Sequence, residues 1–287
     1  MDPRRLELLL ELSRLGSMRA VAETMHTTTS TVSQQLAVLA REAGTTLIEP
    51  YGRRVRLTPA GQRLARHGLA ILAAVEAARL DLDPDAEPAG ELRVAGFATA
   101  VRRSLLPVAA TLAATHPRVR LLIHEHEPAE AFELLTTGVM DLALTYDYTL
   151  APAAFDPALE TLPLWDASWG LGVPRDAPAT GFAGFAAHDW IVNSRNTADE
   201  DVVRTVASLE GFRPRIVHRA DSLELVQDMI VAGLGVGLLP MDAATVPGVR
   251  LLPLTGAEAR LRCYAVTRRG RAGWPPLALV LRLLAGR

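Results

Sequence analysis

The stretch from Arg19 to Ala43 constrains this chain more than any other. It reads RAVAETMHTTTSTVSQQLAVLAREA, with apolar residues at helical spacing on both sides of the polar run 26–30. Short hydroxyl side chains in such a run favour a turn followed by a helix N-cap, because they accept hydrogen bonds from the free N–H groups that open a helix. The pattern therefore predicts a short helix, a tight turn and a second helix, which is the helix-turn-helix arrangement.

The second predicted helix, about 29–43, carries hydroxyls and glutamines and no acid before Glu42. Such side chains donate hydrogen bonds to phosphates and base edges, whereas phosphate repels carboxylates. Double-stranded DNA is therefore an expected partner, and the alternative is a polar-ended helix pair without a DNA role. Base contacts are expected from Thr28, Thr29, Ser30 and Gln34, and phosphate contacts from Thr31, Ser33, Arg53 and Arg54.

The first 68 residues are basic although the whole chain is not. They contain ten arginines and six acidic residues, a net charge of +4, whereas the whole chain carries −2 and the remainder therefore −6. A basic module on an acidic body is typical of a DNA-binding head attached to a sensor domain. Tyr51-Gly52-Arg53 separates two strand-like pieces, which predicts a hairpin, or wing. Its clustered arginines either contact phosphate or form a solvated basic loop.

A long helix is predicted over residues 58–82. Thr58 supplies the cap and Pro59 the first helical position. The helix of roughly 37 Å carries an apolar stripe that no neighbouring domain obviously covers. A second copy of the chain would cover it, which predicts a homodimer through this helix; the alternative is packing against its own winged domain. Residues 83–90, rich in proline, glycine and acid, predict a hinge.

From Glu91 onward, strand patterns alternate with helix patterns. The order strand, helix, strand, helix, strand over 91–148 predicts a parallel sheet. Similar patterns continue without a linker of different composition, so we expect two α/β lobes joined by chain crossings near Pro163–Ser168 and Tyr264–Arg268. The first lobe would comprise about 91–164 and 268–287, and the second about 165–267. A small ligand would fit the cleft between the lobes.

At this point the chain resembles the LysR-type transcriptional regulators of bacteria over essentially its whole length. In the head, the resemblance is carried by Ser17, Ala20, Val32-Ser33, Leu36, Leu39, Leu57-Thr58 and Gly61. In the second half it is carried by LRVAGF (92–97), LLP (105–107), HP (116–117), GVMDLAL (138–144) and AGLGVGLLP (232–240). The sequence departs from the family at Ala40, where an acid is usual, and at Ile48 and Pro50, where Phe and Arg are usual.

The resemblance implies both a fold and a mode of assembly. The fold is an α-helical winged helix-turn-helix head, residues 1–61, followed by a two-lobed α/β effector domain, residues 91–287, of the type 2 periplasmic-binding-protein-like class. The assembly is a homodimer or homotetramer that binds DNA and holds a small effector between the lobes.

Effector contacts are expected where strands end and helices begin on the cleft side. In the first lobe the candidates are Ala98, Thr99 and Ala100 after the first strand, and Tyr146 and Asp147 after the third. In the second lobe they are Asn193, Ser194, Asp221 and Ser222. The helix N-terminus at 98–100 offers free N–H groups and a positive dipole, which suit a carboxylate. Alternatively, residues 146–148 form a crossing loop packed on the core.

No motif predicts a cofactor, a metal or an active site. In a strand, His124-Glu125-His126-Glu127 directs its histidines and glutamates to opposite faces, and no third metal ligand is evident. Cys263 is the only cysteine, which excludes an internal disulfide and fits a cytoplasmic protein. Acids interrupt the apolar stretch at the N-terminus, and no run reaches membrane-spanning length, so no membrane partner is expected.

These patterns predict a sequence-specific DNA-binding regulator of transcription, not an enzyme, whose activity responds to an effector bound between two lobes. One alternative is a small-molecule binding protein or enzyme on the same fold with a vestigial head, which consumption of a metabolite would reveal. Another is an architectural DNA binder with purely structural lobes, which stabilisation by a metabolite would argue against.

Overall fold

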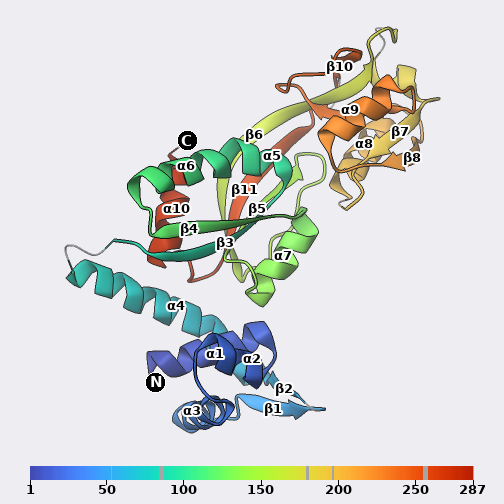
Figure 1. The fold of residues 1–287 in the computed structure, drawn as a ribbon. Coiled ribbons are helices and arrows are strands. Elements are labelled where there is room, and N and C mark those ends of the chain that lie inside the picture. The colour runs from blue at the N-terminus through green and yellow to red at the C-terminus, as the bar shows by residue number, and fades with distance from the viewer. Residues whose placement is uncertain (53, 84–86, 179–180, 196, 255–257, 287) are drawn as a thin grey trace.

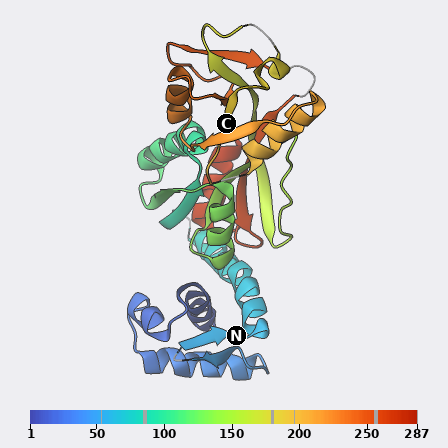
Figure 2. The same cartoon turned by 90° about the vertical axis from the view of Figure 1, so that its right-hand side faces the viewer.

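The computed structural model describes residues 1–52, 54–83, 87–178, 181–195, 197–254 and 258–286. A small helical head with a two-stranded wing lies at one end, and a larger α/β body lies at the other (Figure 1). Helix α4, Pro59–Leu82, runs from the head to the body, and the view turned by 90° shows the two masses joined through it (Figure 2). Within the described ranges, no helix is both long and apolar enough to cross a membrane.

Three capped helices form the head: α1, Pro3–Leu15, α2, Met18–Thr24, and α3, Thr29–Glu42. The residue before each helix accepts a hydrogen bond from a backbone N–H of the first turn through its side-chain oxygen. The buried side chains shared by these helices include Leu6, Leu9, Leu12, Val21, Val32, Leu36 and Leu39. The predicted tight turn between α2 and α3 contains His26, whose φ of 49° is uncommon for a residue other than glycine.

The predicted wing is an antiparallel pair of strands, β1, Ile48–Tyr51, and β2, Arg54–Leu57. Thr58 ties the wing to the long helix that follows. Its Oγ1 accepts a hydrogen bond from the Gly61 N–H at 3.0 Å and donates one to the Thr46 carbonyl at 2.7 Å. The Thr-Pro start predicted for α4 therefore also fixes the position of the wing.

Helix α4 meets both the head and the body. Its first part packs on α1 and buries Ala65, Leu69 and Leu72. Near its middle, Ala70 lies against the turn after strand β11, because a Cβ added at Gly270 would stand 2.7 Å from the Ala70 Cβ. Leu82, at the end of the helix, is 85% exposed. Packing against the chain's own winged domain thus accounts for the first part of the apolar stripe and leaves the last turns uncovered.

Replacing Gly61 with Ala is expected to destabilise the head, because the added Cβ would lie 2.1 Å from the Leu47 carbonyl oxygen. Overpacking of this kind costs about 1–3 kcal/mol. Gly68→Ala is the matched control in the same helix, because its Cβ would meet only side-chain atoms, at 3.8 Å. Thermal melts followed by circular dichroism should show a lower Tm for Gly61→Ala and an unchanged or higher Tm for Gly68→Ala. Equal melting of both variants would contradict this close approach.

The first lobe contains the predicted parallel sheet. Strand β3, Gly90–Gly96, lies between β4, Val119–Glu125, and β5, Leu142–Tyr148. The helical elements of this lobe are α5, Ala98–Ala100, a π-helical segment, Val101–Leu105, α6, Leu106–Thr115, α7, Pro128–Thr137, and α10, Pro275–Ala285. As predicted, the last helix returns to the first lobe, where it contacts β3 and α6.

The second lobe repeats this plan. Strand β7, Asp189–Val192, lies parallel to and between β8, Arg215–Arg219, and β9, Val236–Pro240. A further strand that the sequence analysis missed, β10, Val249–Pro253, pairs with β6. The helical elements of this lobe are a 3-10 turn, Phe182–Phe185, α8, Ala198–Leu209, and α9, Leu223–Val231.

Two antiparallel strands, β6, Leu159–Pro174, and β11, Arg260–Arg268, lie where the lobes join (Figure 1). Strand β6 pairs with β11 up to Ser168 and with β9 and β10 beyond it, so it passes between the lobes within the range expected for the first crossing. The second crossing differs from the expected 264–268. Strand β11 pairs along its length with β5 and β6, so the chain re-enters the first lobe before Arg260.

Candidate DNA-binding face and effector cleft

The two faces of α3 differ sharply in exposure. Val32, Leu36 and Leu39 are fully buried against the other helices of the head. The six residues predicted to contact DNA from this element are all exposed: Thr28, Thr29, Ser30, Thr31, Ser33 and Gln34. A helix with a buried apolar stripe and an exposed polar N-terminal half has the form that enters the major groove in helix-turn-helix proteins.

Hydrogen bonds distinguish the hydroxyl groups at the start of α3. The Thr28 Oγ1 accepts from the Thr31 N–H at 3.1 Å and lies 2.8 Å from the hydroxyls of both Ser30 and Thr31. Thr28 therefore acts first as the cap that fixes the start of α3. Gln35, next to the exposed Gln34, faces the head and accepts a hydrogen bond from Arg5 at 2.9 Å.

The arginines expected at the wing are placed only in part. Arg54 begins β2, and Arg53 lies outside the described residues. Arg56, which was not among the predicted contacts, bonds to Glu49 at 2.7 Å and stands over the Tyr51 ring, 4.9 Å from its centroid. Tyr51 is 62% exposed at the end of β1. An arginine and an aromatic ring thus lie together on the wing.

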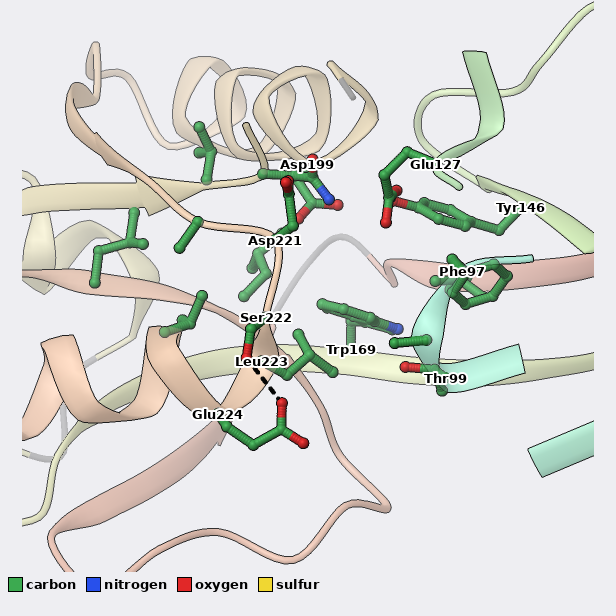
Figure 3. Close-up of a pocket in the computed structure, with 18 of the residues that line it drawn as sticks. Phe97, Thr99, Glu127, Tyr146, Trp169, Asp199, Asp221, Ser222, Leu223 and Glu224 are labelled. Carbon is green, nitrogen blue, oxygen red and sulfur yellow. Dashed lines mark hydrogen bonds between the residues drawn. The ribbon is translucent and has the colours of Figure 1, made fainter. Parts of the chain in front are cut away.

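A cavity of about 250 Å³ lies between the lobes, at the carboxyl ends of their parallel strands (Figure 3). This is the usual place for a ligand in open α/β sheets. The cavity brings together six of the nine predicted effector residues from four separate segments: Ala98, Thr99, Tyr146, Asn193, Asp221 and Ser222.

The other three predicted effector residues do not line the cavity. Ala100 is fully buried within the helical segment after β3. Asp147 follows Tyr146 in a strand and so points to the other face, where it bonds to Arg262 at 2.8 and 2.6 Å. Ser194 donates its backbone N–H to Asp221 at 2.8 Å and orients that carboxylate without lining the cavity.

Sequence reasoning missed most of the charge in the cavity. The lining residues that it did not predict include Glu125, Glu127, Asp199, Glu224 and Trp169. The alternation of His124-Glu125-His126-Glu127 was a usable signal, because it directs both glutamates to one face of the chain. The expectation of a carboxylate ligand at 98–100 does not fit this lining, since the acids of the cavity would repel it.

Glu127 and Asp199 are ionisable groups placed in a poor environment for charge. Glu127 is 4% exposed, and burial raises its pKa to about 7 although the Tyr146 hydroxyl donates a hydrogen bond to it at 2.9 Å. Burial likewise raises the pKa of Asp199 to about 6, against a hydrogen bond donated by the Tyr148 hydroxyl at 2.8 Å. Perturbed carboxyl groups that face a cleft are typical of functional sites.

Aromatic rings form a continuous wall beside these acids. The ring centroids of Phe97 and Tyr146 are 4.6 Å apart, those of Tyr146 and Tyr148 5.8 Å, and those of Tyr148 and Trp169 5.5 Å. Phe97, Tyr146 and Trp169 line the cavity. The wall crosses from the first lobe to β6 and gives the cavity an apolar side.

Polar contacts across the cleft hold the lobes together. Arg102, in the first lobe, pairs with Glu224, in the second, at 2.7 Å. The Tyr148 hydroxyl on β5 reaches Asp199 at the start of α8. Arg102, Glu224 and Asp199 also line the cavity, which therefore lies at the junction between the lobes.

Cys263 lies on β11 and is 1% exposed. Burial raises the pKa of its thiol well above the ordinary value. A reactive cysteine needs a thiol that is both accessible and readily ionised. The Cys263 thiol is buried and its pKa is raised, so it meets neither requirement.

A winged helix-turn-helix with an exposed polar face, joined by a long helix to two lobes around a small cavity, defines a ligand-responsive DNA-binding regulator. Residues 3–62 match the family model described as "Bacterial regulatory helix-turn-helix protein, lysR family", and residues 85–287 match "LysR substrate binding domain". The chain belongs to the LysR family of transcriptional regulators.

Individual relatives agree with this assignment. A probable hydrogen peroxide-inducible genes activator from Mycobacterium avium is 29% identical over 269 residues, which cover 90% of this chain and 80% of the relative. A cysteine variant of full-length OxyR from Pseudomonas aeruginosa superposes with a TM-score of 0.71 at 21% identity, covering 99% of this chain and 94% of that one. Full-length CbnR, solved with its target DNA, gives a TM-score of 0.55 at 21% identity and 99% coverage of both chains.

Proposed function

We propose that this regulator reads DNA with the N-terminal half of α3 and adjusts its activity to a small molecule held in the cleft. The observation that carries the proposal is the exposed polar face of α3 above a fully buried apolar stripe. Base contacts are assigned to Thr29, Ser30 and Gln34, and phosphate contacts to Thr31 and Ser33. Thr28 serves mainly as the cap, and Arg53 and Arg54 on the wing are assigned to phosphate. The CbnR structure with target DNA supports this use of the fold.

The proposed assembly is a homodimer through α4, with a homotetramer as the larger form. The exposed end of α4 supplies an apolar surface that includes Leu82. Two-fold DNA sites favour dimeric readers, because each half-site then receives one recognition helix. The proposed units are the head, residues 1–61, the linker helix, 58–82, a hinge, 83–90, and the two lobes from 91 onward. Residues 84–86 of the hinge lie outside the described residues. We place the protein in the cytoplasm, with the chromosome on which it acts.

The effector is proposed to act by shifting the balance between two arrangements of the lobes. It would lie between Ala98 and Thr99 of the first lobe and Asn193 and Ser222 of the second. A ligand that prefers one arrangement changes the population of that arrangement, and in a dimer this changes the spacing of the paired heads. The difference in the ligand's affinity for the two arrangements is sufficient to link the cleft to DNA binding.

Several relatives are named for induction by hydrogen peroxide, and we do not extend that signal to this chain. Its sequence has a single cysteine, Cys263, and that residue is buried with a raised pKa. Thiol oxidation by peroxide requires an accessible thiolate, and a disulfide within one chain requires a second cysteine. The cleft, not a thiol, is therefore the proposed sensor.

The DNA-binding assignment predicts two different phenotypes. Arg54→Ala should weaken binding to all DNA sequences and reduce the slope of log K against log salt by about 0.9 for each protomer, or about 1.8 for the proposed dimer, because each protomer loses one phosphate contact. Gln34→Ala should lower affinity for the preferred sequence by about 1–3 kcal/mol and relax specificity. Fluorescence anisotropy on DNA from upstream of the chain's own gene, beside scrambled DNA, measures both effects across a salt series.

Arg213→Ala is the charge-matched control, because Arg213 is exposed in the second lobe, far from the head in sequence. It should leave the affinity and the salt slope unchanged. If Arg54→Ala and Gln34→Ala reduced binding equally on every DNA, the division between phosphate and base contacts would be refuted. If the unaltered protein bound native and scrambled DNA with equal affinity, sequence-specific reading at this site would be refuted.

A further inference from the structure

The acids of the cleft outnumber the cations available to them. Five carboxylates line the cavity: Glu125, Glu127, Asp199, Asp221 and Glu224. Arg102, the basic residue among the lining side chains that the structure describes, is already paired with Glu224 at 2.7 Å. The lining of the cavity therefore contains more acidic than basic side chains.

A second arginine, Arg195, stands beside the cavity and is also committed. It pairs with Asp221 at 2.7 Å and approaches Glu125 at 3.6 Å. Hydrogen bonds from Ser194 and Arg195 hold the pKa of Asp221 below its ordinary value, against the effect of burial. Asp221 is thus a stably ionised carboxylate with its own partner.

Glu127 and Asp199 are different, because no basic group among the described residues lies within 4.0 Å of either carboxylate, although Arg195 acts on Glu127 from a longer distance. Each accepts a hydrogen bond from a tyrosine hydroxyl, Tyr146 or Tyr148, and faces the cavity (Figure 3). They come from opposite lobes, so one ligand between them contacts both. A buried carboxylate without a cation is unfavourable, and a positively charged ligand removes that cost.

The apolar side of the cavity also suits a cation. Phe97, Tyr146 and Trp169 present aromatic rings beside the acids, and aromatic faces attract organic cations as well as alkyl chains. The cavity of about 250 Å³ has the volume of roughly eight water molecules. A ligand with a similar number of non-hydrogen atoms would fill it.

We propose that the cleft binds a small organic cation, an amine or guanidinium compound, held between Glu127 and Asp199 and packed against the aromatic wall. This inference rests on the proposed function, because it names the effector class of the same cleft. A cationic ligand is proposed here in place of the carboxylate ligand that the helix N-terminus at 98–100 favours when it is considered alone.

The binding should depend on pH in a defined direction. The charged and titratable groups facing Glu127 are Tyr146 on β5, Asp199 at the start of α8, Asp221 before α9 and Arg195 after β7. Because the pKa of Glu127 is about 7 in the empty cleft, an amine binds the ionised form and affinity falls as pH decreases. Between pH 8 and pH 5.5 the loss should be roughly thirtyfold from Glu127 alone.

The test uses the full-length protein at pH 8 with defined probes. Agmatine, putrescine and phenethylamine are the cations, and succinate and phenylacetate are the anions, each followed by thermal shift and by isothermal titration calorimetry. At least one amine should bind and raise Tm, and neither anion should. Glu127→Gln and Asp199→Asn should each weaken that amine at least tenfold. Glu133→Gln, which removes an exposed acid from α7, is the matched control and should not.

Each outcome decides the matter. Binding of an anion without an amine, or no binding of any amine, overturns the inference, and so does amine binding that Glu127→Gln leaves unchanged. The DNA-binding assay on the same preparation keeps the two proposals separate. If the protein binds its upstream DNA specifically but binds no amine, the regulatory proposal stands and the amine proposal fails. If it binds an amine but shows no specific DNA binding, the amine proposal stands and the regulatory proposal fails.

Discussion

At pH 8, a Glu127→Gln variant without ligand is expected to unfold at a higher temperature than the unaltered protein. Burial raises the pKa of Glu127 to about 7 from an ordinary value of 4.5. Above pH 7 the folded protein therefore holds an ionised, buried carboxylate, which costs roughly 3 kcal/mol of stability. Glutamine keeps the size and can accept the Tyr146 hydrogen bond, but it carries no charge. The expected gain in Tm is several degrees.

The pH dependence of this gain has a definite sign. A carboxyl group whose folded pKa is raised contributes its stability in full below pH 4.5 and loses it as pH rises through 7. Melting curves of the variant and the unaltered protein should therefore coincide near pH 4.5 and separate progressively up to pH 8. Glu133→Gln, an exposed change nearby, should follow the unaltered protein throughout. Coincident curves at pH 8 would show that the buried charge is compensated.

Asp141→Asn is expected to destabilise the first lobe strongly. Asp141 is 6% exposed and lies 3.9 Å from Arg268 and 3.6 Å from Arg271, and it accepts the Arg93 N–H at 3.1 Å. Burial lowers the pKa of Arg268 to about 10 and also that of Arg271, while the charge of Asp141 opposes both shifts. Removing this charge leaves two largely buried guanidinium groups uncompensated, a loss of about 3–5 kcal/mol.

Chemical denaturation of the purified protein measures this loss. Asp176→Asn removes an exposed acid from the second lobe and should stay within about 0.5 kcal/mol of the unaltered protein. A loss for Asp141→Asn no larger than that of the control would mean that solvent or other groups already neutralise the two arginines. Asp141 stands immediately before β5 and accepts the Arg93 N–H of β3, so the destabilisation is expected in the first lobe.

Local chemistry made most of the elements predictable. The hydroxyl run before Val32 and the Thr58-Pro59 pair fix where α3 and α4 begin, because caps act within one turn of a helix. The long strand β6, Leu159–Pro174, depends in part on pairing with a strand far away in the sequence. Its first part, 159–166, carries proline and charged residues and is a strand because β11 pairs with it, which is a contact between distant segments.

The cleft also depends on contacts between distant segments, which local sequence does not reveal. Six effector residues were placed on the cavity because strand order alone indicates which loops meet. Asp147 was misplaced because the alternation along β5 puts it opposite Tyr146. The sequence alone favours an anion at 98–100, because the local field there is positive, whereas the proposed cation depends on Glu127 and Asp199, which come from other segments. Charges from separate parts of the sequence add only in the folded protein.

Strand β11 begins at the cavity and ends beside α4. Leu261, near its start, lines the cavity, and Gly270, just beyond its end, leaves no room for a Cβ beside Ala70 of the long helix. The strand pairs with β5 and β6 on its two sides and so resists bending. The strand is therefore a stiff element about 30 Å long between the cavity and the linker helix. Because Gly270 is packed directly against Ala70, we expect a displacement of the first residues of β11 to move α4 as well.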